Sequence, residues 1–361
     1  MDTSDPDIHF NANGVCTYCT NWMERVRNET FAHHPTRNLQ SLVTSIKAAG
    51  RRREFDCIIG VSGGVDSTYV AYLVKDLGLR PLAVHLDNGW NSELAVDNIH
   101  LTLSKLGVEL HTHVIDWEEF RDLQLSFIKA SVTNIEIPTD HGINAILQQV
   151  AVQNQVRYIL TGSNIRGEGM YPRSWGWYNL DLRHLEAVHQ RFGSIALKTF
   201  PRISLTTFAI NTLFRGIRTV PILNYIDYNR PKVVKLLVDR LGWRPYPGKH
   251  YESIFTRFFQ GYILPRKFNV DKRRPHLATL VAAGDISRDD ALNQLSKDPY
   301  EGSDLESDLE YFLKKFDLTR AQFEVYMREP IRQHREFKTN AWFFDGLPFV
   351  KRIAKQIATR K

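Results

Sequence analysis

The stretch CIIGVSGGVDSTYVAYLV, which runs from Cys57 to Val74, decides the fold of this chain. Together with the preceding Asp56, its opening residues form a short apolar run up to Val61, bounded by turn residues, and such a run predicts a buried strand. A helical pattern then continues to about Leu77. The turn SGGVDS between them therefore lies at the carboxyl end of a strand, which is where open parallel sheets bind their ligands.

Strands and helices continue to alternate after this first pair. Further strands are expected at Pro81 to Asp87, Val108 to Ile115 and Val156 to Gly162, and helices at Glu93 to Leu106, Glu118 to Ala130 and Gly142 to Asn154. Helices of this length between strands imply a parallel sheet with helices on both faces and right-handed crossovers. We therefore predict an α/β fold with a mostly helical C-terminal region.

The pattern divides the chain into three parts. Residues 1–50 carry a CxxC pair and a helix, residues 51–230 hold the alternating strands and helices, and residues 231–361 are mostly helical. Helical patterns occupy Arg230 to Trp243, Ser287 to Lys297 and Asp304 to Phe316. We expect the third part to contact a substrate or a partner.

Composition and charge narrow the class of protein. The formal net charge of +7 suits an acidic partner such as ATP, a nucleotide-sugar or nucleic acid. No apolar run approaches the length of a membrane span, and the acidic start MDTSDPDIHF lacks the features of a secretory signal. We therefore expect no membrane span and a cytoplasmic location.

The turn at residues 62–67 has the features of a cradle for a multiply charged anion. Gly63 and Gly64 lack a Cβ atom, so the backbone can bend sharply and approach a ligand closely. The N–H groups that open the next helix, with its N-terminal partial charge, favour phosphate. The hydroxyls of Ser62 and Ser67 can donate further hydrogen bonds. The weaker interpretation is an ordinary strand–helix corner with Asp66 and Ser67 as helix caps.

This turn is not the GxxxxGK[ST] loop of P-loop ATPases, because it contains no lysine. It closely resembles the SGGxDS signature of the PP-loop ATP pyrophosphatases, which implies a fold like that of the adenine nucleotide alpha hydrolases. In such enzymes the loop holds the pyrophosphate end of ATP while an acceptor oxygen attacks the α-phosphate. The resemblance implies that ATP binds at Ser62, Gly63, Gly64, Val65, Asp66 and Ser67. Asp66 either orients Mg²⁺ or only caps the helix.

Two other strand ends carry polar residues that suit the same site. HLDNGW ends the second strand with Asp87 and Asn88, which in this family lie near the nucleotide or the metal. LTGSNIRGEG follows the fourth strand. Since carboxyl ends of parallel strands converge on one crevice, we expect nucleotide contacts there from Thr161, Gly162, Ser163 and Asn164. The alternative for each stretch is plain loop chemistry.

Longer stretches resemble a narrower family. They are the first 19 residues, HLDNGWNSELAVDNI, TGSNIRGEG and, most specific of all, GKHYESIFTRFFQGYILPRKFNVDKRRPHLATLVAAGDISRDDAL from Gly248 onward. They look like the N-acetyl sugar amidotransferases of bacterial surface polysaccharide biosynthesis. The resemblance implies conversion of a sugar N-acetyl group to an acetamidino group, in an O-antigen precursor such as a nucleotide-sugar.

The chemistry of that conversion needs ATP, Mg²⁺ and ammonia. Adenylylation turns the amide oxygen into a leaving group, as an O-adenylyl imidate, and ammonia then displaces AMP; Mg²⁺ bridges phosphate oxygens. Residue 2 is Asp, and none of the three cysteines lies in a plausible nucleophile elbow, so this chain is not expected to hydrolyse glutamine itself. The resemblance implies a separate glutaminase subunit and a cyclase-like barrel protein that conducts ammonia.

Cations after residue 248 are the candidates for binding ATP and an acidic sugar nucleotide. We select Lys249 and Arg273, with Asp66, as candidate catalytic residues; a solvated basic helix is the alternative for the two cations. The sequence indicates no general base.

Cys16 and Cys19 have the spacing of half a zinc site, but a closed structural site needs four ligands. His33 and His34 are candidates for the remainder, although adjacent histidines rarely both bind one ion. A structural pair of reduced thiols is the favoured alternative to bound Zn²⁺.

Two rival functions fit parts of the pattern. A tRNA-modifying PP-loop enzyme, of the lysidine synthetase or thiolase type, is compatible with the loop and the positive charge. A thiolase generally needs reactive cysteines near ATP, and only Cys57 is close in sequence; no RNA-binding module is evident, so nucleic acid is not the expected partner. The intact SGGVDS turn argues against a non-catalytic nucleotide-binding subunit.

Overall fold

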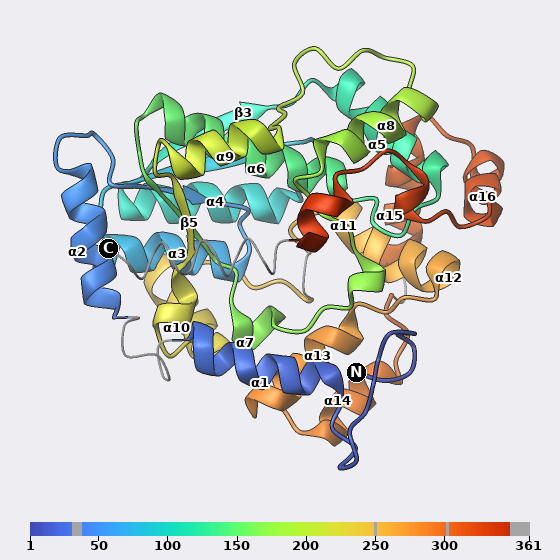
Figure 1. Cartoon of the computed structure of the whole chain (residues 1–361), viewed down its shortest axis with the longest axis horizontal. Coiled ribbons are helices and arrows are strands. Elements are labelled where there is room, and N and C mark those ends of the chain that lie inside the picture. Colours follow the sequence, from blue (N-terminus) through green and yellow to red (C-terminus); the bar gives the residue numbers. More distant parts are fainter. Residues whose placement is uncertain (31–37, 249–250, 301–302, 347–361) are drawn as a thin grey trace.

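The apolar run that opens the quoted stretch forms β1 (Cys57–Gly60), the middle strand of a parallel sheet. The computed structural model describes residues 1–30, 38–248, 251–300 and 303–346. Its sheet has five strands in the order β3–β2–β1–β4–β5 (Figure 1), and every neighbouring pair is parallel. The predicted α/β class is therefore confirmed.

The elements follow one another in the expected alternation. The strands after β1 are β2 (Pro81–Asp87), β3 (Glu109–Val114), β4 (Tyr158–Thr161) and β5 (Arg218–Pro221). The helices before and between them are α1 (Thr17–Glu29), α2 (Leu39–Gly50), α3 (Val65–Asp76), α4 (Glu93–Leu106), α5 (Trp117–Ala130), α6 (Ile137–Gln153), α7 (Ile165–Glu168), α8 (Leu182–Phe192) and α9 (Leu205–Leu213). After β5 come α10 (Arg230–Leu241), α11 (Ile254–Phe258), α12 (Leu264–Phe268), α13 (Arg273–Ala283), α14 (Arg288–Leu295), α15 (Ser303–Phe316) and α16 (Arg320–Arg328).

Two elements differ from the sequence-based expectation. The four residues of β5 pair with β4 at the edge of the sheet, where Pro221 costs no ladder hydrogen bond, and such a short run has no readable periodicity. Helix α6 begins at Ile137 rather than at Gly142, because Pro138 is favourable in a first helical turn.

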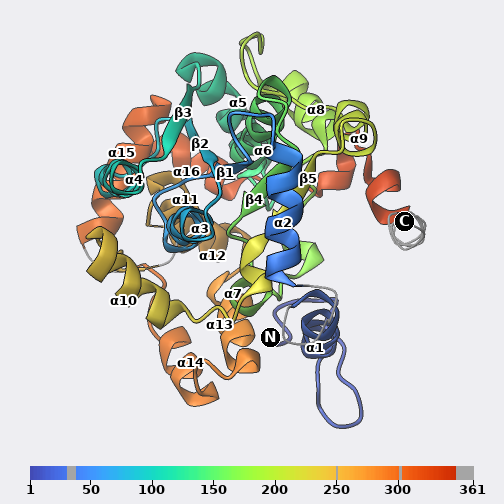
Figure 2. The same cartoon turned by 90° about the vertical axis from the view of Figure 1, so that its left-hand side faces the viewer.

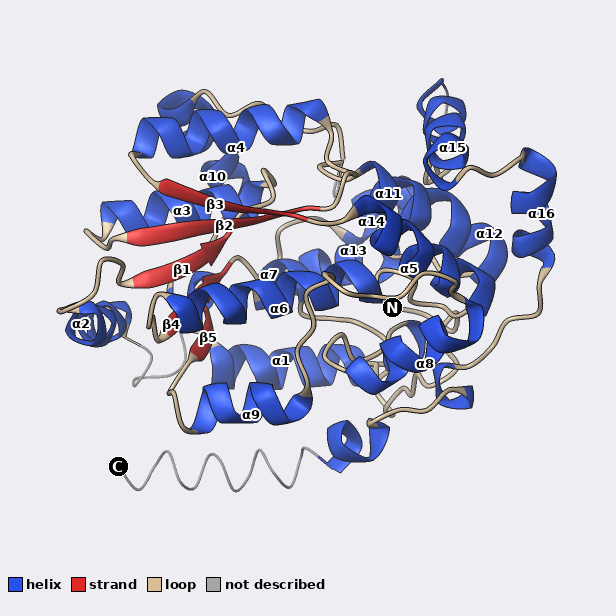
Figure 3. Cartoon of the chain, turned by 90° about the horizontal axis from the view of Figure 1, so that it is seen from above, coloured by secondary structure: helices blue, strands red, loops and turns tan. Residues whose placement is uncertain are grey.

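Helices cover both faces of the sheet, which explains why β1 is apolar throughout. Successive side chains of a strand point to opposite faces. Ile58 belongs to the core under α5 and α6, while Cys57 and Ile59 belong to the core under α3, α4 and α10 (Figure 3). All three side chains are fully buried, so a continuous apolar run is what this position requires.

The N-terminal residues pack against parts of the chain that are distant in sequence. Figures 1 and 2 both place α1 beside α7 and α13. Trp22 of α1 packs on Ile165 and Met170, and its indole N–H donates to the Ile165 carbonyl at 2.9 Å. The division at residues 50 and 230 remains a prediction.

Trp90, three residues after β2, joins the sheet to the C-terminal helices. It is fully buried, and its ring centroid lies 5.2 Å from that of Phe255 on α11 and 5.4 Å from that of Phe316 on α15. Its indole N–H donates to Gln124 on α5 at 2.7 Å. The C-terminal helices are thereby held at the carboxyl edge of the sheet (Figure 3).

None of the helices in the described part of the chain combines the length and the apolar character that a membrane crossing requires.

We predict that Trp90→Ala lowers the free energy of unfolding by about 3–5 kcal/mol, because it leaves a large cavity between the sheet and the helices and removes the donor to Gln124. Urea denaturation followed by circular dichroism measures the change. Trp342→Ala is the control, since that side chain is 72% exposed, and its effect should stay within about 0.5 kcal/mol. Equal effects of the two substitutions would contradict the assigned role of Trp90.

Candidate active site

The turn predicted to hold phosphate connects β1 to α3 at the carboxyl edge of the sheet. It bends at Gly63, whose φ is +79°. A Cβ atom at this position would lie 2.5 Å from the carbonyl oxygen of Ala95 on α4. Glycine is therefore required at position 63 both for its backbone conformation and for its packing.

The peptide group between Gly63 and Gly64 is held from outside the turn. The Gly63 carbonyl accepts hydrogen bonds from the Trp243 indole at 3.0 Å and from the Tyr246 hydroxyl at 3.1 Å. A trans peptide directs its C=O and N–H to opposite sides, and the Gly64 N–H accordingly faces Ser62 Oγ at 3.4 Å. A segment after α10 thus orients a turn that lies far earlier in the chain.

Helix α3 begins without a side-chain cap. Its N-cap is Gly64, whereas the side chains of Ser92, Asp116 and Asn229 cap α4, α5 and α10. The first N–H groups of a helix lack intrahelical acceptors and carry partial positive charge. The start of α3 is therefore open to an anionic ligand.

The two serine hydroxyls of the turn line the same cleft. Ser67 Oγ accepts a hydrogen bond from the Ser62 N–H at 3.2 Å and donates to the Gly64 carbonyl at 3.1 Å. Ser62 Oγ lies 3.2 Å from Ser67 Oγ. Both are hydroxyl rotors, so they can turn to donate to phosphate oxygens when a nucleotide binds.

Asp66, the second residue of α3, is positioned by two neighbours. Its carboxylate accepts a hydrogen bond from the Tyr228 hydroxyl. Burial, and next the charge of Asp66, raise the pKa of Tyr228, so this hydroxyl stays protonated as a donor. Gly162 at the end of β4 packs against the Asp66 backbone, where a Cβ atom would lie 3.0 Å from the Asp66 carbonyl carbon.

These groups open into a cleft of about 360 Å³. Besides the turn, its walls include Asn164 and Arg166 from the β4 side, Arg230 at the start of α10, and Glu252 before α11. A Cβ atom on Gly64 would lie 3.2 Å from Glu252 Oε1, so this carboxylate is next to the phosphate cradle. The Arg230 side chain is exposed and makes no hydrogen bond or ion pair with the described residues, which leaves its charge available to a phosphate.

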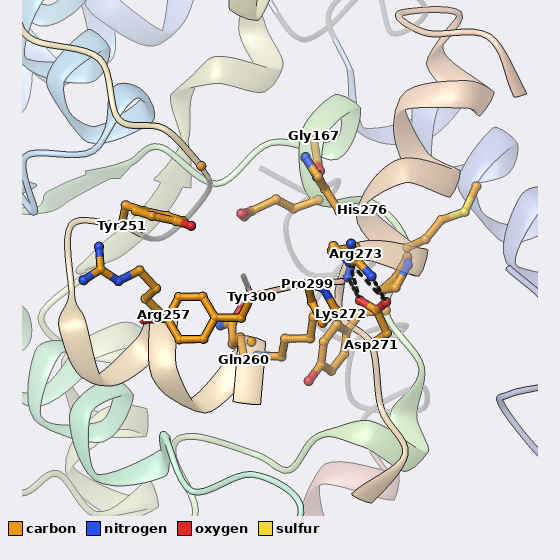
Figure 4. A pocket seen from close by; sticks show the side chains of 16 residues that line it. Gly167, Tyr251, Arg257, Gln260, Asp271, Lys272, Arg273, His276, Pro299 and Tyr300 are labelled. Carbon is orange, nitrogen blue, oxygen red and sulfur yellow. Dashed lines mark hydrogen bonds and ion pairs between the residues drawn. The ribbon is translucent and has the colours of Figure 1, made fainter. Parts of the chain in front are cut away.

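A second cavity of about 470 Å³ adjoins this cleft, and the two share Gly167, Glu168, Gly248 and His276 (Figure 4). Figure 4 shows Tyr251 and Arg257 on one side of the second cavity, with Asp271 and Arg273 on the other. The cleft and the second cavity together can hold a nucleotide next to a second substrate.

A π-helical turn forms part of the wall of the second cavity. Residues Phe259–Ile263 wind as a π-helix between α11 and α12 and place Gln260 and Gly261 on the cavity. A Cβ atom on Gly261 would lie 3.1 Å from Tyr300, so glycine permits that close contact. π-Helical turns inside helices are frequent at functional sites.

Four residues after or at the end of β4 were predicted to contact the nucleotide, and the structure places two of them on the cleft. Gly162 and Asn164 line the cleft, and Asn164 also caps α7 by accepting from the Gly167 N–H at 2.6 Å. Thr161 and Ser163 are not among the residues that line the cleft in the described part of the chain. Their predicted nucleotide contacts therefore stay predictions.

Asp87 and Asn88 shape the turn after β2 instead of lining the cleft. Asp87 Oδ1 accepts from the Gly89 N–H at 3.0 Å, and Asn88 Oδ1 accepts from the Trp90 N–H at 3.2 Å. These two hydrogen bonds stabilise the turn that places Trp90 against the C-terminal helices. The predicted contact of Asp87 and Asn88 with nucleotide or metal is not tested by this geometry.

Of the two cationic side chains predicted to be catalytic, only one lies among the described residues. Lys249 lies outside the described residues. Arg273 lines the second cavity, but its guanidinium donates to the Asp271 carboxylate and to the carbonyls of Gln294 and Lys297. These bonds attach α13 to the end of α14, so they favour a structural role; a catalytic role for Arg273 remains a prediction.

The side chains at the predicted zinc position and at the predicted magnesium position differ in how well they suit the metal ion. Cys16 Sγ and Cys19 Sγ lie 3.5 Å apart at the start of α1, and no group of three or more His, Cys, Asp or Glu side chains among the described residues could hold a metal ion. His33 and His34 lie outside the described residues. Zinc is therefore not shown.

A magnesium ion needs fewer protein ligands than a structural zinc ion. It is usually bound by one or two carboxylates together with substrate phosphates and water. Asp66 and Glu252 both line the cleft beside the turn, so the residues present fit a magnesium ion bound with ATP.

Residues of this site that were not among the sequence-based candidates include Arg166, Tyr228, Arg230, Trp243, Tyr246 and Glu252. Four of them lie at the two ends of α10, and their spacing in the sequence matches no motif. A usable signal was the aromatic and cationic residues around the helix predicted from Arg230, since the strand order brings that helix to the same face as α3.

The C-terminal part of the chain matches a known family. Residues 252–351 match the family described as LPS biosynthesis protein WbpG-like, C-terminal domain. The glutamine-hydrolysing GMP synthase of Pyrobaculum aerophilum is 29% identical over 106 residues, which are 29% of this chain and 20% of that protein. This chain therefore spans about a fifth of the length of that curated relative.

Two solved structures have low similarity to the chain. A predicted subunit of tRNA methyltransferase from Methanocaldococcus jannaschii has a TM-score of 0.29 at 12% identity, over 51% of this chain and 75% of that chain. NMN synthetase from Francisella tularensis has a TM-score of 0.31 at 16% identity, over 59% of this chain and 89% of that chain.

We predict that Gly63→Ala abolishes measurable ATP binding, because the added methyl group meets the Ala95 carbonyl and displaces the cradle. Isothermal titration calorimetry with ATP and Mg²⁺ tests this. Gly107→Ala is the control: Gly107 also has a positive φ, of +59°, but nothing lies within 4 Å of the position that its Cβ atom would take. That substitution should cost about 1 kcal/mol of stability and leave ATP affinity unchanged.

We further predict that Arg230→Met weakens ATP binding about tenfold by removing one charge-assisted hydrogen bond to phosphate. Arg240→Met, at the exposed far end of the same helix, is the matched control and should bind ATP like the unmodified chain. Equal affinities for the two variants would exclude Arg230 from the phosphate site.

Proposed function

We propose that this chain is a PP-loop ATP pyrophosphatase with a WbpG-like C-terminal region, and that it converts a sugar N-acetyl group to an acetamidino group in lipopolysaccharide biosynthesis, with ATP consumed and AMP formed. One observation carries this proposal. The phosphate cradle opens into a cleft that shares four lining residues with a second cavity, and that second cavity is built mainly from the WbpG-like residues 252–351.

In the first step the turn holds the β- and γ-phosphates. The backbone N–H groups at the start of α3 and the hydroxyls of Ser62 and Ser67 donate to their oxygens, and Arg230 adds charge. Asp66 and Glu252 would hold Mg²⁺, which supplies charge neutralisation to the phosphates when bound. These groups stabilise the negative charge that develops on departing pyrophosphate.

The acceptor amide lies in the second cavity under this proposal. Its oxygen attacks the α-phosphorus, and the bond from that phosphorus to pyrophosphate breaks. Alignment of two bound reactants in adjoining cavities supplies much of the rate acceleration in such transfers. The product of this step is the O-adenylyl imidate of the sugar.

In the second step ammonia attacks the imidate carbon, and the carbon–oxygen bond breaks. AMP leaves with the former amide oxygen, and the nitrogen stays on the sugar as an amidine. The sugar is proposed to be nucleotide-linked, in keeping with the resemblance to the N-acetyl sugar amidotransferases.

Ammonia is proposed to come from a separate glutaminase through a cyclase-like barrel protein. Cys57 is fully buried in β1, and burial raises the pKa of its thiol, so it is unsuited to attack glutamine. Burial, and next the hydrogen bond to Cys16, also raise the pKa of the Cys19 thiol.

We predict that the purified chain, given ATP, Mg²⁺ and an N-acetylated nucleotide-sugar, forms AMP, pyrophosphate and an amidine with ammonium but not with glutamine. Mass spectrometry of the sugar measures the product, since replacement of oxygen by NH lowers its mass by about one unit. Gly63→Ala should remove the activity, and Gly107→Ala should retain it. Turnover with glutamine would refute the separate glutaminase, and no AMP with any acceptor would refute the proposed reaction.

A further inference from the structure

A third cavity, of about 770 Å³, adjoins the second and shares no lining residue with the cleft at the turn. Its walls come from the loop before α6, the loops on either side of Trp175, and the segment after α16. Asp7 and Arg173 at its rim are exposed, so it is open to solvent. The three cavities form a series from this rim to the phosphate cradle.

The wall between the second and third cavities consists of side chains. Both cavities are lined by Tyr171 and Lys272. Lys272 Nζ lies 3.2 Å from Glu136 Oε2, and Gln260 Nε2 donates to the same oxygen at 3.2 Å. Because Gln260 faces the second cavity and Glu136 the third, this set of hydrogen bonds is the partition.

Asp140, one turn after Glu136 on α6, faces the third cavity beside this partition. Glu136 is paired with Lys272, and Asp345 with Arg335, whereas Asp140 has no ion pair among the described residues. Its hydrogen-bond partner is the Asn179 side chain.

We propose that the third cavity is the entry for ammonia, and that Asp140 takes a proton from ammonium before neutral ammonia passes Lys272 into the second cavity. The inference rests on the proposed function, because only that reaction consumes ammonia here. The Asp140 carboxylate accepts one proton from NH₄⁺, NH₃ moves on, and the carboxyl returns its proton to water in the open third cavity. No bond other than N–H and O–H changes.

The charge of Lys272 gives the partition its selectivity. Like charges repel in a partly desolvated site, so the Lys272 ammonium disfavours passage of ammonium relative to neutral ammonia, while the paired Glu136 carboxylate offsets part of this repulsion. The Lys272 ammonium stays charged, because the Glu136 carboxylate raises its pKa against the effect of burial. An acceptor that is adenylylated in the second cavity is therefore attacked by neutral ammonia, which is the nucleophile.

The surroundings of Asp140 suit the exchange of a proton near neutral pH. Burial, and next the charge of Glu136, raise the pKa of Asp140 to about 7, against the opposing effects of Lys272 and the Asn179 hydrogen bond. Tyr171 faces it from the loop after α7, and the pKa of that hydroxyl is raised, so Tyr171 stays neutral. The other titratable groups of this cavity are Asp7, Arg173, Tyr178, His334, Arg335 and Asp345.

The test compares two partial reactions of the full chain. The ATP–pyrophosphate exchange that the acceptor supports needs no ammonia, whereas amidine formation needs it. Asp140→Asn should keep the exchange rate and lower kcat/KM for total ammonium about tenfold to 100-fold at pH 8. Asp140→Glu should restore part of the loss. Asp317→Asn, an exposed charge outside all three cavities, is the control and should change neither reaction.

The unmodified chain provides a second measurement that needs no variant to fold. If Asp140 deprotonates ammonium inside the protein, log(kcat/KM) for total ammonium, normalised to the exchange rate, rises with pH and levels off above about pH 7, once Asp140 is ionised. If the enzyme takes free ammonia from solution, the rise continues without that break up to the pKa of ammonium.

The outcomes are separable. An unbroken profile, or an unchanged ammonium kcat/KM in Asp140→Asn, overturns the proposal while the reaction itself stands. Equal losses of exchange and amidine formation in Asp140→Asn also overturn it, and indicate that the third cavity holds part of the acceptor. Exchange and amidine formation both absent from the unmodified chain refute the proposed function.

Discussion

The site depends on one peptide group, the one between Gly63 and Gly64. Its carbonyl is bound by the Trp243 indole and the Tyr246 hydroxyl, and its bend fits against Ala95 only because residue 63 has no side chain. With the carbonyl bound by these two side chains, the Gly64 N–H faces the Ser62 hydroxyl, and the start of α3 carries no side-chain cap. An anion site of this kind would be assembled before a ligand arrives, which would spare the cost of reorganising dipoles during a reaction.

The same edge of the sheet also carries the second half of the protein. Trp90 lies three residues after β2 and is surrounded by aromatic rings from α11 and α15. This packing places the helices that line the second cavity next to the turn that is predicted to bind phosphate. Burial of large aromatic side chains makes the junction rigid, so the distance between the two cavities is set by the core and not by a flexible linker.

The partition at Lys272 is built from polar side chains, at a position where an apolar core would be at least as stable. A buried ion pair gains little over well-packed hydrophobic residues, because desolvation of both charges offsets their attraction. Glu136 nevertheless accepts from both Lys272 and Gln260, and Gln260 lies on a π-helical turn. The position of this cluster between two cavities is consistent with the proposed role in ammonia entry, which stability alone does not explain.

Much of the fold was predictable from the sequence, because strands, helices and the SGGVDS turn are local patterns. β2 was predicted at its observed bounds, and β1, β3, β4, α3 and α4 close to theirs. β5 was missed, since four residues carry no periodicity and its strand character comes from pairing with β4. Gly162 and Asn164 line the cleft and their nucleotide contacts stay predictions, whereas the observed contacts of Asp87 and Asn88 are with the turn before Trp90.

The amino-acid sequence by itself determined the parallel α/β arrangement and the position of the phosphate turn, because hydrophobic periodicity and glycine chemistry act over a few neighbouring residues. Only the tertiary structure decided which groups hold that turn and which cavities meet it. Trp243 and Tyr246 lie about half the chain away from Gly63, and Lys272 reaches Glu136 across a similar gap. Contacts at such separations depend on how the helices pack on the sheet, and no local pattern encodes that packing.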